Sequence, residues 1–137
     1  MKIIKTTAQA MGPLYGQLFI DVFGHQYEHH VPDHVWLFAK EDESDIMGFA
    51  EGYEIKRNEI FLQFGGCRPE YRGFRVKKWL RQVRDYLHED YIHIITSVEN
   101  TNTPMLRLYL SIGYVIFGVK IATDKTVFVE LISECNK

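Results

Sequence analysis

The stretch that decides the fold reads EIFLQFGGC at residues 59–67, RPEYRG at 68–73 and, after a helical segment, YIHIITSV at 91–98. Side chains of the first segment alternate between two faces, and the last segment is rich in apolar and β-branched residues. Both patterns predict strands. Apolar residues recur at helical spacing between them, at Val76, Leu80, Val83 and Leu87. A strand–helix–strand crossover of this length predicts two parallel, neighbouring strands.

The segments before this stretch predict a strand, a helix and an antiparallel meander. Pro13 suits the first turn of the helix and Gly24 suits its end. A polar loop is expected at residues 25–33, after the helix. The expected elements are a strand at 1–6, a helix over about 11–23, and strands at 34–40, 46–55 and 59–64.

The segments after it predict a short helix at about 104–111, with Gly113 at its C-terminal cap, and a closing hairpin of strands at 114–121 and 126–132. The element order β-α-β-β-β-α-β-α-β-β predicts a mixed α/β fold: a central mixed sheet of about six or seven strands with flanking helices. Residues 1–137 are expected to form a single domain.

Composition excludes several classes of protein. A chain that is 46% hydrophobic and 25% charged is typical of a folded globule, and a net charge of −2 disfavours nucleic-acid binding driven by overall charge. No apolar run approaches the ~20 residues of a membrane span. Two cysteines, Cys67 and Cys135, do not make a disulfide framework, so a cytoplasmic location is expected.

A basic cluster lies at the start of the central helix. Seven Lys or Arg fall between Arg68 and Arg84, with Glu70 the one acid. Ligands of such crossover units bind near the helix N-terminus, whose free N–H groups suit a phosphate. The alternative interpretation is a solvated helix face.

Two motifs resemble the GNAT superfamily of acyl-CoA N-acyltransferases. RGFRVKKWL at 72–80 resembles the signature [Gln/Arg]-x-x-Gly-x-[Gly/Ala], preceded by the typical PEYRG at 69–73. NTPMLRLYLSIGY at 102–114 resembles Asn-x-x-Ala-x-x-Leu-Tyr-x-x-x-Gly-Phe. The resemblance implies a GNAT-like fold over nearly the whole chain and acetyl-CoA as cosubstrate.

The sequence departs from the first motif at its small positions, which are Arg75 and Lys77 here. These side chains either clamp phosphates or fill the cofactor site. Paired glycines at Gly65 and Gly66 favour a bulge or a ligand close to the backbone, as in the family, where pantetheine pairs with this strand; a plain strand end is the alternative.

The resemblance also implies roles for individual residues. Tyr109 would protonate the departing thiolate, Asn102 would touch the pantetheine arm, and a backbone N–H near Cys67 would polarise the thioester carbonyl. The cofactor-binding residues predicted in this way are Gly66, Cys67, Arg72, Gly73, Phe74, Arg75, Val76, Lys77 and Asn102. For Tyr109, packing as a helix aromatic is the alternative.

The general base is left open. Glu59 shares a strand face with Phe61, which stands where some family members carry a glutamate, so Glu59 is the candidate; a solvated edge carboxylate is the alternative. Glu51 and Glu54 on the preceding strand are further candidates, and a dedicated base need not exist.

No metal site is expected. HQYEH at 25–29 matches a zinc-peptidase pattern, but the stretch follows a helix-ending Gly24 and precedes Pro32, so it is expected to be irregular. The resemblance makes this loop, with Tyr27, His29, His30 and His34, the rim of the acceptor site. Cys67 is not expected to be a nucleophile, because no Cys–His pair is suggested by spacing.

The expected function is direct transfer of acetyl from acetyl-CoA to a primary amine, with Tyr109 as general acid. The alternative is a catalytically silent GNAT-fold module that binds a protein or nucleic acid through the basic 68–84 surface. The acceptor stays open among polyamine, aminoglycoside, metabolite amine and protein lysine. A homodimer is a further expectation, because the edge of a terminal hairpin often pairs in such folds.

Overall fold

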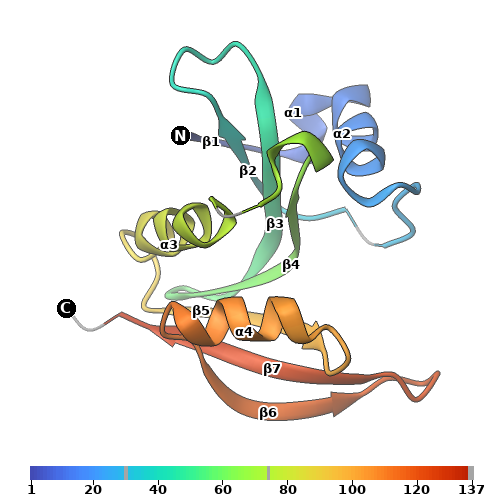
Figure 1. Cartoon of the computed structure of the whole chain (residues 1–137), viewed down its shortest axis with the longest axis vertical. Helices are drawn as coiled ribbons and strands as arrows, with labels where there is room; N and C mark the ends of the chain where they lie inside the picture. The colour runs from blue at the N-terminus through green and yellow to red at the C-terminus, as the bar shows by residue number, and fades with distance from the viewer. Residues whose placement is uncertain (30, 74, 136–137) are drawn as a thin grey trace. The chain divides into compact units, whose positions relative to one another are not determined.

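The computed structural model describes residues 1–29, 31–73 and 75–135, and its elements are labelled in Figure 1. Contacts divide the chain into two compact units. Unit 1 contains Met1–Tyr53 and Gln63–Val76, and unit 2 contains Glu54–Leu62 and Lys77–Lys137. Each unit is built from two separated stretches of chain, and the expectation of one domain stays a prediction.

Unit 1 begins with strand β1 (Lys2–Thr6) and two helices, α1 (Ala8–Met11) and α2 (Pro13–Phe23). Thr7 caps α1 through its side chain, Pro13 opens α2, and Gly24 ends α2 in the left-handed conformation at φ 80°. Strand β1 pairs antiparallel with β2 (His34–Ala39), and β2 pairs antiparallel with β3 (Ile46–Lys56).

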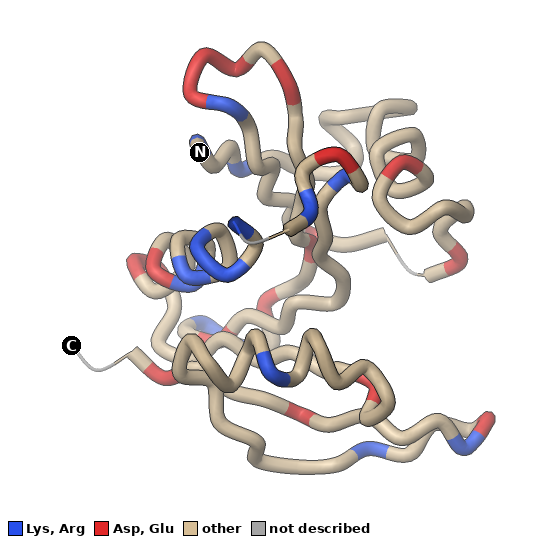
Figure 2. Tube along the Cα trace, in the orientation of Figure 1, with Lys and Arg blue, Asp and Glu red and all other residues tan. Residues whose placement is uncertain are grey.

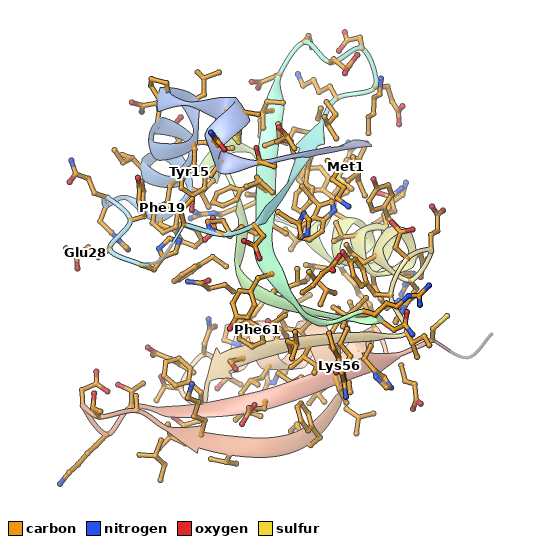
Figure 3. The ribbon with its side chains drawn as sticks, turned by 180° about the vertical axis from the view of Figure 1, so that it is seen from behind. Met1, Tyr15, Phe19, Glu28, Lys56 and Phe61 are labelled. Carbon is orange, nitrogen blue, oxygen red and sulfur yellow. The ribbon has the colours of Figure 1, made fainter. Side chains whose placement is uncertain are left out.

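The core of unit 1 is aromatic. Phe19 of α2 is 1% exposed, and Tyr15 and Phe19 project from α2 toward the strands of this unit (Figure 3). Their rings contact Phe49 of β3 with centroids 6.5 and 6.1 Å away. Burial of each such side chain contributes about 1.5–3 kcal/mol, which fixes α2 against the strands.

Strand β4 (Glu59–Cys67) runs from unit 2 into unit 1, and its glycines have a packing cause. A Cβ on Gly48 would lie 2.3 Å from the Gly66 carbonyl oxygen, and a Cβ on Gly66 would lie 2.8 Å from Val22 Cγ1. A Cβ on Gly48 would thus meet backbone, whereas a Cβ on Gly66 would require Val22 to shift, so glycine is favoured at both positions and most strongly at Gly48. Because β4 continues through Cys67, the paired glycines are not a plain strand end.

Unit 2 contains helices α3 (Val76–Leu87, from Lys77 on) and α4 (Thr103–Ser111) and strands β5 (His93–Glu99), β6 (Val115–Ile121) and β7 (Val127–Glu134). The first part of β4 pairs parallel with β5 from Glu59↔His93 to Leu62↔Thr96. Strand β7 pairs antiparallel with β5 and with β6. The core of unit 2 includes the buried side chains of Val83, Leu87, Ile94 and Leu131.

The strands form a seven-stranded mixed sheet in the order β1-β2-β3-β4-β5-β7-β6, with flanking helices. The predicted α/β fold and the parallel crossover are confirmed. Most boundaries differ from the predictions by one to three residues, and two of the differences have a clear local cause. Gly12, at φ 59°, separates α1 from α2, and β5 starts at His93 because the Tyr91 amide still donates to Leu87 O at the end of α3 (2.9 Å).

Among the described residues, no helix has the length and apolarity needed to cross a membrane.

Candidate active site

The predicted phosphate loop leads directly into α3. Gly73 has φ +138°, a conformation that glycine adopts without strain, and open space surrounds the position of its missing Cβ. The Val76 amide donates to the Gly73 carbonyl at 3.1 Å, which closes the turn before the helix. Phe74, one of the predicted cofactor residues, lies outside the described residues.

The two departures from the family pattern are exposed. Arg75 lies in the turn before α3 and Lys77 lies on the first turn of α3, and both residues are exposed. Lys and Arg gather along α3 in Figure 2. Neither residue is buried, and contact of their side chains with phosphates stays a prediction.

Three arginines of the basic 68–84 surface have internal partners. Arg68 pairs with Asp45 at 2.9 Å and with Asp21 at 3.3 Å. Arg72 donates to the carbonyl oxygens of Cys67 (Nε, 3.0 Å) and Val22. In unit 2, Arg84 donates to the Ile112 carbonyl and to Asp85. These contacts engage the three guanidinium groups, so less charge is left for a polyanion than the sequence suggests.

Arg72 therefore has a structural use that the sequence did not indicate. Its guanidinium joins the end of β4 to the end of α2, beside Gly66. Cys67 is buried, and burial raises the pKa of its thiol while the charge of Arg72 acts in the opposite direction. A buried thiol with a raised pKa is a poor nucleophile.

Tyr109 lies on α4 in unit 2, half-buried and in contact with two neighbours. Its ring packs against Tyr114 with centroids 4.8 Å apart, and its hydroxyl interacts with Thr96 of β5. Burial raises the pKa of the Tyr109 hydroxyl, and the Thr96 hydrogen bond partly offsets this. The phenol is therefore protonated at neutral pH, as a general acid must be.

Asn102 is the N-cap of α4. Its side-chain Oδ1 accepts from the Met105 amide at 3.4 Å, and its carbonyl accepts from the Leu106 amide at 3.1 Å. The structure thus gives Asn102 a helix-capping role. Contact with pantetheine stays a prediction from the resemblance.

Glu59 is held at the beginning of β4, at the opposite end of this strand from Gly66 and Cys67. Its carboxylate lies 3.2 Å from His93 Nδ1 and 3.3 Å from Lys56 Nζ. Glu59 is thus a paired carboxylate, 14% exposed, on a strand inside the sheet order, so it is not a solvated edge carboxylate, and its role as base stays a prediction.

The structure brings together three residues that the sequence analysis did not combine. Glu51 of β3 is fully buried, at 0% exposure. Tyr15 of α2 donates a hydrogen bond to its Oε2, and His29 Nε2 lies 2.6 Å from its Oε1. Burial raises the pKa of Glu51 to about 7, although the Tyr15 hydrogen bond acts in the opposite direction. A carboxyl group that titrates near neutrality is typical of functional sites.

A signal for this cluster exists in the sequence. Glu51 is the one charged residue in the otherwise apolar or small stretch IMGFAEG at 46–52 of β3. A carboxylate buried on a strand needs partners, and the helix and loop before it supply a tyrosine and histidines. Only the fold identifies which of them reach it. Within the described residues, no group of three or more His, Cys, Asp or Glu is arranged to hold a metal ion, and His30 lies outside them.

Comparison with known proteins identifies the family of the chain. Residues 4–114 match the profile of the acetyltransferase (GNAT) family. No curated protein matches the sequence. The chain therefore belongs to the GNAT acetyltransferase family, as its two motifs indicated.

Solved structures show the same fold at low sequence identity. The ribosomal-protein-S18-alanine N-acetyltransferase of Escherichia coli is 12% identical with a TM-score of 0.72, covering 97% of this chain and 94% of that one. A mutant of the spermidine N-acetyltransferase SpeG of Vibrio cholerae is 13% identical with a TM-score of 0.75, covering 98% and 95%. A GNAT acetyltransferase of Elizabethkingia anophelis with acetyl-CoA bound is 15% identical with a TM-score of 0.69, covering 98% and 97%.

Proposed function

We propose that this protein is an N-acetyltransferase that moves the acetyl group of acetyl-CoA directly to a primary amine. The observation that carries the proposal is the turn from Gly73 into α3, in a chain that matches the family profile over residues 4–114. A helix N-terminus preceded by a glycine turn presents amide donors to a phosphate. The exposed Arg75 and Lys77 add charge-assisted hydrogen bonds to the diphosphate.

Tyr109 is the proposed general acid. When acetyl-CoA is bound, its thioester supplies an activated acetyl group, and acyl transfer releases a thiolate. The Tyr109 hydroxyl, protonated at neutral pH because burial raises its pKa, gives its proton to that sulfur. The acceptor is a primary amine, and the named activities of the similar structures suggest a polyamine or a protein N-terminus as the first two to test.

Calorimetry with acetyl-CoA tests the cofactor part of this proposal. We expect micromolar binding, weakened about tenfold by Arg75→Ala and by Lys77→Ala, since each removes a charge-assisted hydrogen bond. Lys78→Ala, a change of an exposed lysine on the same helix that is not among the predicted cofactor-binding residues, is the matched control and should bind as the unmodified protein does. Tighter binding by the Arg75 and Lys77 variants would mean that these side chains obstruct the site, and absence of heat at millimolar acetyl-CoA would favour the silent module.

A homodimer through β6 is the proposed assembly. Strand β6 is last in the sheet order, and its apolar residues are exposed, Val119 at 62% and Ile121 at 68%. Gly118 pairs with Glu130 of β7, whose carboxylate lies 3.6 Å from the position of a Gly118 Cβ. Antiparallel pairing of two β6 strands about Val119 would set Lys120 of the second copy opposite Gly118, beside that carboxylate. Charge complementarity thus favours a second copy of this chain.

The cytoplasm is the proposed location. Cys67 and Cys135 are both free thiols in the structure, as expected of a protein from a reducing compartment.

A further inference from the structure

The Tyr15–His29–Glu51 cluster has no use in the mechanism described so far. It joins three segments of unit 1: α2, the loop after it and β3. The carboxylate of Glu51 is 0% exposed, whereas the His29 side chain is 12% exposed. Any proton that this cluster exchanges with a ligand or with solvent therefore passes through His29.

The hydrogen bonds define the direction of that exchange. The Tyr15 hydroxyl donates its single proton to Glu51 and lies 3.1 Å from His29 Nε2. Burial and the Glu51 carboxylate raise the pKa of Tyr15, so this proton stays in place. With Glu51 ionised, His29 Nε2 must carry a proton to pair with the carboxylate, and the lone pair of the neutral imidazole is on Nδ1.

Other titratable side chains pack near the cluster. Among the described residues packed against it, the titratable groups are Tyr27 and His25 of the same loop, whose rings contact Tyr15 and Phe19. Strand β2 contributes Val35, the register partner of Glu51. An imidazolium formed at His29 would be stabilised by the buried carboxylate of Glu51, 2.6 Å away.

Strand β4 connects the cluster to the predicted acetyl position. The His29 ring stacks on Phe64 with centroids 4.5 Å apart. Phe64 precedes Cys67 by three residues, about 10 Å along an extended strand. The resemblance assigns polarisation of the thioester carbonyl to the backbone near Cys67. The His29 ring therefore packs against the same strand that carries this backbone, three residues before Cys67.

We infer that His29 is the proton acceptor for the substrate amine, and that Glu51 and Tyr15 are its positioning residues. The inference rests on the proposed function. A proton leaves the ammonium nitrogen for His29 Nδ1, and the freed lone pair forms the bond to the acetyl carbon as the carbon–sulfur bond breaks. The nitrogen loses its second proton to solvent, the thiolate sulfur takes up one proton, and His29 passes its proton on to solvent, so one proton is released for each ammonium acetylated.

Two amines of similar size test the inference, with acetyl-CoA as donor at pH 7. Ethylamine is almost wholly protonated at that pH, whereas 2,2,2-trifluoroethylamine is mostly neutral and needs no proton acceptor. We expect His29→Gln to lower kcat/KM for ethylamine by about 100-fold and to leave that for trifluoroethylamine nearly unchanged. The ethylamine defect should shrink as the pH is raised, because a growing fraction of the amine is then neutral.

His25→Gln, in the same loop with its ring edge-on to Phe19, is the matched control and should leave the ratio of the two kcat/KM values unchanged. Tyr15→Phe keeps the ring and removes one hydrogen bond, so it should show a smaller defect of the same kind if His29→Gln does not fold. Equal losses for the two amines, or no loss, would overturn the inference. A protein that binds acetyl-CoA but acetylates neither amine would also overturn it, whereas failure to bind acetyl-CoA contradicts the proposed function itself.

Discussion

Tyr109 on α4 and Tyr114, which follows the end of this helix, show how a chemical role can be distinguished from a packing role. Tyr109 was predicted as an acid from a motif, and the structure adds a neighbour, Thr96, and a raised pKa. Tyr114 lies next to it, is 4% exposed and also has a pKa raised by burial. Burial alone therefore does not distinguish an acid from a packing residue, and a kinetic comparison does.

Tyr109→Phe should lower turnover by about 100-fold while leaving acetyl-CoA affinity nearly unchanged, because it removes a proton donor and keeps the ring. Steady-state kinetics and calorimetry on the same preparation measure the two quantities. Tyr114→Phe removes a hydroxyl from the ring 4.8 Å away and should retain turnover. A parallel loss of turnover and affinity in Tyr109→Phe would mean that Tyr109 only packs.

Glu51 should also shape the dependence of stability on pH. Its pKa is about 7 in the folded protein against an ordinary 4.5, so the folded state holds this proton more tightly than the unfolded state does. The free energy of unfolding should then fall as the pH rises from about 4.5 to 7, by roughly 3 kcal/mol from this group.

The Glu51→Gln variant should lack the part of the pH-dependent decrease in the free energy of unfolding that comes from Glu51. Urea unfolding at pH 5 and at pH 8 measures it, and the variant should lose less stability between the two than the unmodified protein. An identical loss in both proteins would show that Glu51 ionises in the folded state as it does in the unfolded chain.

At the level of elements, the close approach of β3 to the end of β4 depends on two glycines. Gly48→Ala should destabilise the protein by about 2 kcal/mol or more, because the new Cβ would lie 2.3 Å from a backbone oxygen that cannot move freely. Gly65→Ala is the matched control on β4: its Cβ would have contacts of 3.5 Å and longer, so stability should change little. Thermal unfolding compares them, and equal stability of the two variants would mean that the strands separate readily.

Most elements could be predicted from the sequence because their signals are local. Pro13 and Gly24 bound α2, and apolar spacing defines α3 from Val76 to Leu87. The break at Gly12 was missed, because the apolar face continues across it. The partners of Arg68 and Arg72 were missed too, since their acceptors come from segments distant in sequence.

The candidate site was predictable to a lesser degree for the same reason. The motifs identified the turn at Gly73 and the position of Tyr109, which depend on short spacings. The Tyr15–His29–Glu51 cluster joins residues up to 36 apart in sequence, and only the pairing of β2 with β3 and the packing of α2 bring them together. The sequence analysis preferred Glu59 to Glu51 as the base because alternation along a strand shows which residues share a face. Alternation does not show which end of the strand lies near the site.

For the whole molecule, the exposed β6 predicts concentration-dependent assembly. Light scattering after size-exclusion chromatography should show a dimer, and Val119→Lys should give a monomer because it places like charges at the centre of the paired strands. Leu14→Lys, which changes an α2 side chain that is 68% exposed, is the control and should remain dimeric. A monomeric unmodified protein at high micromolar concentration would contradict the proposed pairing.

Acetyl transfer by this protein can be measured as release of free coenzyme A thiol in the presence of an amine. Purified protein is incubated with acetyl-CoA and, separately, with spermidine, an alanine-ended peptide, a lysine peptide and an aminoglycoside, and product masses are measured. We expect thiol release that depends on at least one amine, together with a product heavier by one acetyl group. Binding of acetyl-CoA without acetylation of any amine, or no binding at all, would contradict the proposed function.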